Sequence, residues 1–139
     1  MKSSLVYLLF IPFFILITSC GKYDEGPSLS LLSKKQRFTG TWELARFYIG
    51  ENQIQITNKE EMTVNKNGTF TKSIIISTNS FNSNGNWEFS EDKESLLMKY
   101  SATTTETWMI KRLSNRQLFA EFQTPSSVYR YEYVKKNKD

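Results

Sequence analysis

Histidine is absent from the 139-residue sequence, and cysteine occurs only once. The lack of histidine removes the commonest general base, the commonest transition-metal ligand and the usual haem ligand. It therefore excludes catalysis by a serine–histidine–aspartate triad or by a cysteine–histidine pair. We predict neither a cofactor nor a metal site.

Carboxylate pairs are the remaining route to acid–base catalysis, and they need a cleft that shifts the pKa of one member. The acidic pairs of this sequence fall in polar, turn-like stretches: Asp24-Glu25, Glu60-Glu61 and Glu91-Asp92. We therefore predict that the protein is not an enzyme.

Strong charge of one sign is also missing. The chain has 18 basic and 14 acidic residues, a net charge of +4, which is too small an excess to indicate nucleic-acid binding. Part of the excess lies in the C-terminal tail, at Lys135, Lys136 and Lys138. This tail could touch anionic lipid head groups, or it could be a solvated end that keeps the last strand from pairing with other chains.

The single cysteine, Cys20, ends a hydrophobic N-terminal run. Lys2 supplies a positive charge, residues 5–17 are almost wholly apolar, and small polar residues precede the cysteine, as in a secretory signal. The run is short for a bilayer-spanning helix, which needs about 20 apolar residues. Residues 17–21, Ile-Thr-Ser-Cys-Gly, resemble the lipobox of bacterial lipoproteins.

This resemblance implies cleavage before Cys20 and lipidation of its thiol, so that residues 1–19 are a signal peptide and residues 20–37 are the lipidated cysteine and a tether. The alternatives are an ordinary cleaved signal and an uncleaved anchor. Gly21 stands where an aspartate would favour inner-membrane retention. Residues 22–25 resemble the surface-export signals of Bacteroidota-type lipoproteins, or form a solvated tether. We predict an outer-membrane lipoprotein, either periplasmic or exposed at the cell surface.

The rest of the sequence, roughly a hundred residues, is enough for one domain. A short helix capped by Ser28 or Ser30 is expected before Gly40, followed by short alternating strands and tight turns. A loop of Asn, Ser and Gly is expected over 79–85. The predicted strands are 42–49, 53–57, 61–65, 69–78, 86–90, 95–101, 105–113, 117–124 and 128–135. With no long helix between them, they should form an antiparallel meander that closes into a barrel or folds into a sandwich.

The motif Gly40-Thr41-Trp42 on the first strand resembles the opening of the lipocalins. In that family the tryptophan packs across the closed end of the barrel, often under an arginine from the last strand, and Arg130 lies on that strand here. Small lipocalin-like lipoproteins of the Bacteroidota type look closest. They share the tether, a hairpin such as Asn67-Gly68-Thr69-Phe70, and a repeat such as Gly85-Asn86-Trp87.

The sequence departs from typical lipocalins because it lacks a Thr-Asp-Tyr motif and a helix after the last strand, and because its domain is shorter. The resemblance nevertheless implies an all-β fold. We expect an antiparallel up-and-down, lipocalin-like barrel of about eight strands over residues 38–136, preceded by a short N-terminal helix.

An eight-stranded barrel has an interior just wide enough for one small ligand. The aromatic residues predicted to line it are Trp42, Phe70, Trp87, Phe89, Trp108 and Phe122. The alternative is that they simply fill the core. Tyr129, Tyr131 and Tyr133 share one face of the last strand and either form an exposed binding stripe or pack inward. Inward packing would prevent Arg130 from covering Trp42.

The resemblance implies a membrane-anchored lipoprotein that binds a small hydrophobic ligand, a lipid or a fatty acid, without catalysis. The alternative is a protein-interaction or structural module of the cell envelope with a solid barrel, and a sugar-binding module is a third possibility. The predicted partners are the membrane, through Cys20, and the small ligand. No nucleic acid is predicted, and the sequence names no protein partner.

Overall fold

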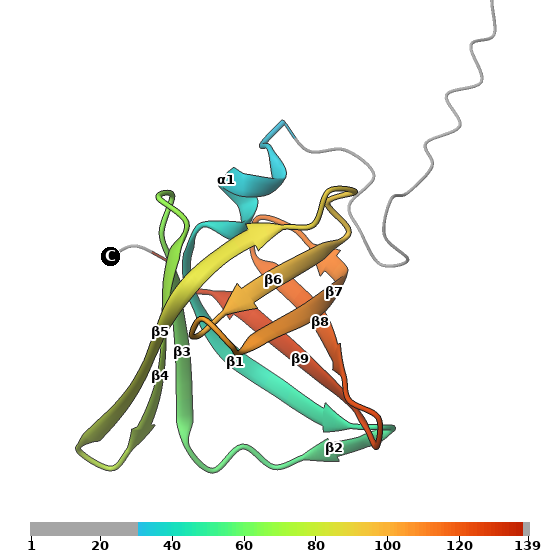
Figure 1. Cartoon of the computed structure of the whole chain (residues 1–139). Coiled ribbons are helices and arrows are strands. Elements are labelled where there is room, and N and C mark those ends of the chain that lie inside the picture. Colours follow the sequence, from blue (N-terminus) through green and yellow to red (C-terminus); the bar gives the residue numbers. More distant parts are fainter. Residues whose placement is uncertain (1–30, 138–139) are drawn as a thin grey trace, which may run out of the picture.

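The computed structural model describes residues 31–137, in which nine strands form one antiparallel sheet that closes on itself (Figure 1). The predicted signal peptide, Cys20 and the first part of the predicted tether lie outside the described residues. The elements are α1 (Lys34–Phe38), β1 (Gly40–Ile49), β2 (Asn52–Ile54), β3 (Lys59–Val64), β4 (Thr69–Ile76), β5 (Asn79–Phe89), β6 (Ser95–Lys99), β7 (Thr105–Leu113), β8 (Gln117–Gln123) and β9 (Val128–Lys135). Between residues 31 and 137, no helix is both long and apolar enough to cross a membrane.

The sheet is an up-and-down barrel of eight strands, as the alternating pattern predicts. Strands β3 to β9 pair in sequence order, and β1 pairs with both β3 and β9, which closes the ring. The short strand β2 pairs only with the far end of β1. Bulges in β1 and β7, at Ala45 and Lys111, shift the register by one residue and allow the sheet to curl.

The predicted loop over 79–85 is wrong, because these residues form the first half of β5. They pair with β4 residue by residue, from Asn79 opposite Ile76 to Asn86 opposite Thr69. The reversal lies at Ser77 instead, whose positive φ of 55° makes the tight turn. Asn and Ser conceal the strand in the sequence because the backbone ladder, and not side-chain burial, holds this part of β5.

The predicted helix cap is also wrong. The helix starts later, at Lys34, and Ser33 caps it. The Ser33 hydroxyl accepts a hydrogen bond from the Gln36 backbone N–H, and the Gln36 side chain accepts one from the Ser33 N–H. This reciprocal pair is a capping box, which satisfies two donors that the first turn leaves without partners.

Helix α1 closes one end of the barrel with Phe38, which is fully buried. The Phe38 ring meets Trp87 edge-to-face, with ring centroids 4.8 Å apart, and the Trp42 indole N–H donates to the Phe38 carbonyl oxygen at 2.7 Å. Trp42 thus lies at the closed end, as the resemblance implies. The other core side chains at and below this end are Met62, Val64, Phe70, Leu96, Met98, Trp108, Ile110, Leu113, Leu118, Ala120 and Tyr133.

Lys135, not Arg130, covers Trp42. Its ammonium lies 4.6 Å from the centre of the Trp42 ring and donates to the Arg37 carbonyl oxygen at 2.5 Å, and burial lowers its pKa. Arg130 faces outward and lies over Tyr48, 4.1 Å from its ring centre. Gly40, at a φ of 134°, leaves room for this arrangement, because a Cβ there would lie 2.9 Å from the Lys135 Cε.

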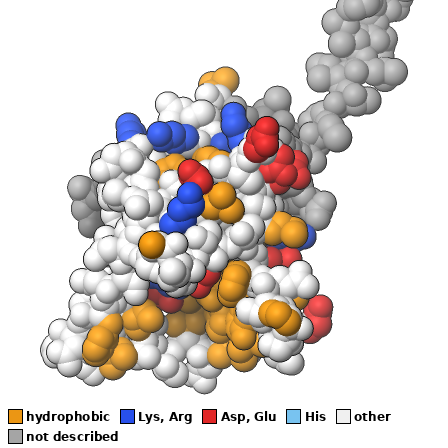
Figure 2. All heavy atoms as spheres, viewed as in Figure 1, with side chains coloured by type: hydrophobic (Ala, Val, Ile, Leu, Met, Phe, Trp, Pro, Cys, Tyr) orange, Lys and Arg blue, Asp and Glu red, His pale blue; other side chains and the backbone are white. Residues whose placement is uncertain are grey.

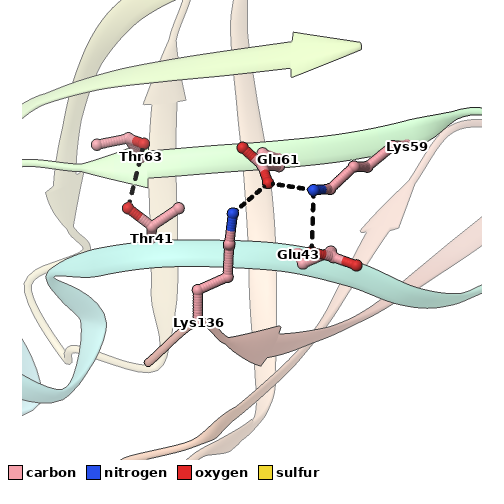
Figure 3. Close-up of polar contacts among 6 residues, drawn as sticks. All are labelled: Thr41, Glu43, Lys59, Glu61, Thr63 and Lys136. Atoms are coloured by element: carbon pink, nitrogen blue, oxygen red, sulfur yellow. Dashed lines mark hydrogen bonds and ion pairs between the residues drawn. The ribbon is translucent and has the colours of Figure 1, made fainter. Parts of the chain in front are cut away.

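The outer face carries a polar ladder over the strands where the barrel closes (Figure 3). Glu61 on β3 accepts from Lys59 at 2.9 Å and from Lys136, which follows β9, at 2.7 Å. The hydrogen bonds from both lysines lower the pKa of Glu61. Exposed pairs of this kind contribute about 0–1 kcal/mol each, so the ladder adds little to the stability of the fold.

We expect Gly85→Ala to lower the free energy of unfolding by about 3 kcal/mol, because overpacking and backbone displacement carry costs of that order. The new Cβ would overlap the Lys99 carbonyl oxygen and lie 2.7 Å from Cε1 of Phe70. Urea unfolding measures the change. Ser83→Ala, on the same strand, is the control and should shift stability by less than about 0.5 kcal/mol. Equal stabilities for the two variants would contradict the close packing at Gly85.

Candidate functional site

The interior of the barrel changes from filled to open along its length. Residues that face each other across paired strands share a face, so the register identifies the side chains that point inward. Along β4, the exposed fraction of these side chains rises from 1% at Phe70 to 39% at Ile74 and 42% at Ile76. Along β1, it rises from 0% at Trp42 to 37% at Ile49. The barrel is therefore solid near α1 and open to solvent at the other end.

An apolar rim surrounds this open end. Figure 2 shows hydrophobic side chains gathered over the lower part of the molecule, away from α1. The rim consists of inward-facing residues that remain exposed or half-buried: Phe47, Ile49, Ile54, Ile74, Ile76, Phe81, Phe122 and Tyr129. Two of these rings are ordered by stacking, with Phe47 and Tyr129 nearly parallel at 6.3 Å.

Between the rim and the solid core lies a layer of polar side chains, which we call the interior polar layer. Its members come from five strands or their ends: Glu60, Lys72, Tyr100, Glu106, Tyr131 and Tyr133. Each shares the inward face of its strand with core residues, as Glu60 does with Met62 and Lys72 does with Phe70.

Two carboxylates organise this layer. Oε1 of Glu60 pairs with the Lys72 ammonium at 3.1 Å and accepts the Tyr133 hydroxyl at 2.5 Å. Oε2 of Glu106 accepts the indole N–H of Trp108 at 2.9 Å and the Tyr100 hydroxyl at 3.2 Å.

Lys72 also lies against aromatic faces. Its ammonium is 5.0 Å from the ring centre of Tyr131 and 5.6 Å from that of Trp108, and these two rings stack on each other at 5.1 Å. Cation–π contacts at these distances compensate part of the desolvation of the lysine.

The tyrosines of the layer hold their protons firmly. Burial, reinforced by the charge of Glu106, raises the pKa of Tyr131 to about 12 and that of Tyr100 further. Burial and the charge of Glu60 raise the pKa of Tyr133 well above its ordinary value. All three hydroxyls are therefore neutral near pH 7 and act as hydrogen-bonding groups.

All six aromatic residues predicted to line a ligand site point into the barrel. Trp42, Phe70 and Trp87 lie in the solid part, and Phe89 packs against Trp87 and Phe38 there. Trp108 borders the interior polar layer through its hydrogen bond to Glu106. Only Phe122 belongs to the rim, where it stacks on Tyr129. Their role in binding a ligand stays a prediction.

The interior polar layer was missed because Glu60 was placed in a turn-like stretch, whereas it lies on β3. Strict alternation could have found it, since Glu60, Met62 and Val64 must share one face, as must Phe70, Lys72 and Ile74. The three tyrosines of β9 pack inward, which is one of the two arrangements that the sequence left open.

A second concave surface lies outside the barrel at its closed end. It encloses about 840 Å³ and carries the basic side chains Lys66, Arg116, Lys135 and Lys136. In the part of the chain that the structure describes, no cluster of three or more acidic or thiol side chains could hold a metal ion.

Comparison with known proteins supports the fold alone. No protein-family model and no curated protein sequence matches this chain. Among solved structures, an odorant-binding protein from bovine nasal mucosa superposes with a TM-score of 0.50 and 15% sequence identity, over 80% of this chain and 79% of that one. Bovine odorant-binding protein in complex with its natural ligand gives a TM-score of 0.49 and 14% identity over the same shares. The predicted fold class, an eight-stranded lipocalin-like barrel with a short helix near its start, is confirmed.

Raising the pH above 10 should destabilise the fold. The folded state binds the protons of Tyr100, Tyr131 and Tyr133 more tightly than the unfolded chain, whose tyrosines titrate near 10. Their contribution to stability is complete below pH 10 and is lost as the pH rises through the folded-state values. Urea unfolding and tyrosinate absorbance between pH 8 and 12 measure this. Titration of all seven tyrosines near pH 10 without unfolding would contradict the inward placement.

Proposed function

We propose that the protein binds a small, largely apolar ligand in the open half of the barrel, without catalysis. The observation that carries this proposal is the apolar rim, whose inward-facing side chains stay partly exposed while the rest of the interior is filled. A ligand that covers the rim gains about 25 cal/mol per Å² of apolar surface removed from water. Apolar walls with a few polar groups at the base are typical of small-molecule sites.

The fold supports this proposal as an analogy. The bovine nasal protein that shares the fold is described as odorant-binding. Folds host many unrelated functions, so the rim and the interior polar layer of this chain carry more weight than the analogy.

A solid-barrel module of the cell envelope is the competing function. The observation that favours it is the packing near α1, where Trp42, Trp108 and Tyr133 are wholly buried. In such a protein the outer faces or loops would contact a protein partner, and the open half would hold only water. The two functions differ in whether an apolar molecule enters the barrel.

We also propose that residues 1–19 are removed and that the thiol of Cys20 is lipidated, which anchors the protein to the outer membrane. Two or more acyl chains suffice for long-lived anchoring, at about 0.8 kcal/mol per buried methylene. The charge of the closed end supports an orientation in which this end faces the membrane. The described chain begins next to α1, at the end that carries Lys66 and Arg116 beside the already engaged Lys135 and Lys136, and the cations Lys66 and Arg116 suit anionic head groups.

A charge placed in the rim should weaken binding of an apolar ligand. In a soluble form that lacks residues 1–20, we expect Ile74→Lys to reduce the affinity for the neutral fluorescent dye Nile red about tenfold, because the ammonium must be desolvated. Val134→Lys is the matched control. Val134 is 42% exposed, close to the 39% of Ile74, but it lies on the outer face of β9. Absence of dye binding by the unmodified chain would favour the solid-barrel module.

Cys20→Ala should release the protein from membranes, since it removes the atom that would carry the lipid. Fractionation of cells that express the full chain, followed by detection in the soluble and membrane fractions, measures this. Ser19→Ala keeps the cysteine and is the control. A membrane fraction that Cys20→Ala leaves unchanged would contradict the lipid anchor.

A further inference from the structure

Each carboxylate of the interior polar layer has one oxygen left open. Oε1 of Glu60 takes both the Lys72 ammonium and the Tyr133 hydroxyl, and Oε2 of Glu106 takes both Trp108 and Tyr100. Among the described residues, none donates a hydrogen bond to Oε2 of Glu60 or Oε1 of Glu106. Neither oxygen is among the unpaired atoms that are sealed from solvent. The layer therefore presents unused acceptors to whatever enters the barrel.

Most donors of the layer are already engaged, and only the Tyr131 hydroxyl finds no acceptor among the described residues. Lys72 is committed to Glu60 and to the ring faces of Tyr131 and Trp108. The hydroxyls of Tyr100 and Tyr133 both donate to carboxylates. A ligand thus meets acceptors that need donors, and few donors that need acceptors.

The charge of the layer points the same way. It contains two carboxylates, from Glu60 and Glu106, and one ammonium, from Lys72. The Lys72 ammonium that pairs with Glu60 lies 5.6 Å from the ring centre of Trp108, whose indole N–H donates to Glu106, so both carboxylates border one region of the interior. Where a bound ligand displaces water, such an imbalance favours a cationic group and disfavours an anionic one.

We propose that the ligand is a cationic amphiphile, with a protonated amine that reaches the open oxygens of Glu60 and Glu106 and an apolar tail that lies against the rim. This inference rests on the proposed binding function and deepens it. It replaces the fatty acid expected from the sequence, because a carboxylate head would face two carboxylates and a single lysine that is already paired. A purely apolar ligand would desolvate the open oxygens without replacing their hydrogen bonds, which is costly.

A series with one tail and three head groups tests the charge preference. We expect octylamine to bind the full chain at least tenfold more tightly than octanol, and octanoate to bind more weakly than octanol. Isothermal titration calorimetry on the protein in lipid nanodiscs measures the affinities, with empty nanodiscs of the same lipid as the partition baseline. Octanoate that binds as tightly as octylamine would overturn the inference, while binding of any of the three would leave the proposed function standing.

Two interior variants and one outer control test whether the preference for a cationic head group arises from the interior polar layer. We expect Glu106→Gln to weaken octylamine binding about tenfold and to leave octanol unchanged, because it removes a charge but keeps the shape. Lys72→Met should change the octylamine affinity in the opposite direction, so that octylamine binds more tightly. Glu88→Gln makes the same chemical change on the outer face of β5, beside Lys99, and should change neither affinity.

These variants separate the possible failures. Thermal unfolding of each variant checks that it is folded before titration. Equal loss of octylamine affinity in Glu88→Gln and Glu106→Gln would overturn the inference, since it would assign the effect to net charge and not to the interior. If octylamine, octanol and octanoate all fail to bind the unmodified chain, both the inference and the proposed function are wrong.

Discussion

The pairing of β1 with β9 is the constraint on which the rest of the structure depends. It joins the two ends of the meander through seven residue pairs, from Trp42 opposite Lys135 to Ile49 opposite Tyr129. Once the sheet is closed, every second side chain must lie inside, whatever its polarity. The filled end, the apolar rim and the interior polar layer all follow from this rule, and they differ only in their position along the barrel axis.

Closure also explains why charged side chains lie inside the barrel at all. Burial of Glu60 and Lys72 costs desolvation that their mutual attraction only partly offsets. An all-apolar interior of the same volume is expected to be as stable or more so. Function selects against such an interior when a ligand must be held in one orientation, because a few polar groups in an apolar cavity fix a head group while the walls supply affinity.

The sequence was sufficient to predict the barrel but not to predict which side chains lie inside it. Alternation and turns predicted eight or nine strands, and the Gly-x-Trp motif placed Trp42 at the closed end correctly. Arg130 was a candidate cover for Trp42, and the sequence left open whether Arg130 or the tyrosines of β9 face inward. The tyrosines do, and Lys135, which shares their parity, covers Trp42. Asn79 to Gly85 was missed because composition conceals a strand held by its backbone. Glu60, Lys72 and Glu106 were missed because polar residues were assumed to face water, whereas closure turns them inward.

The pairing of β1 with β9 also determines when the domain can finish folding. A chain that is synthesised or exported from its N-terminus presents β1 first and β9 last, so β1 keeps an unpaired edge until nearly the whole domain has emerged. Contacts between residues so distant in sequence make folding slow, since the entropy of a long loop is lost before the contacts form. During that interval the edge of β1 is open to other strands, and the bulge at Ala45 is a feature that discourages such pairing. Completion of the domain therefore waits for its final eight-residue strand, β9.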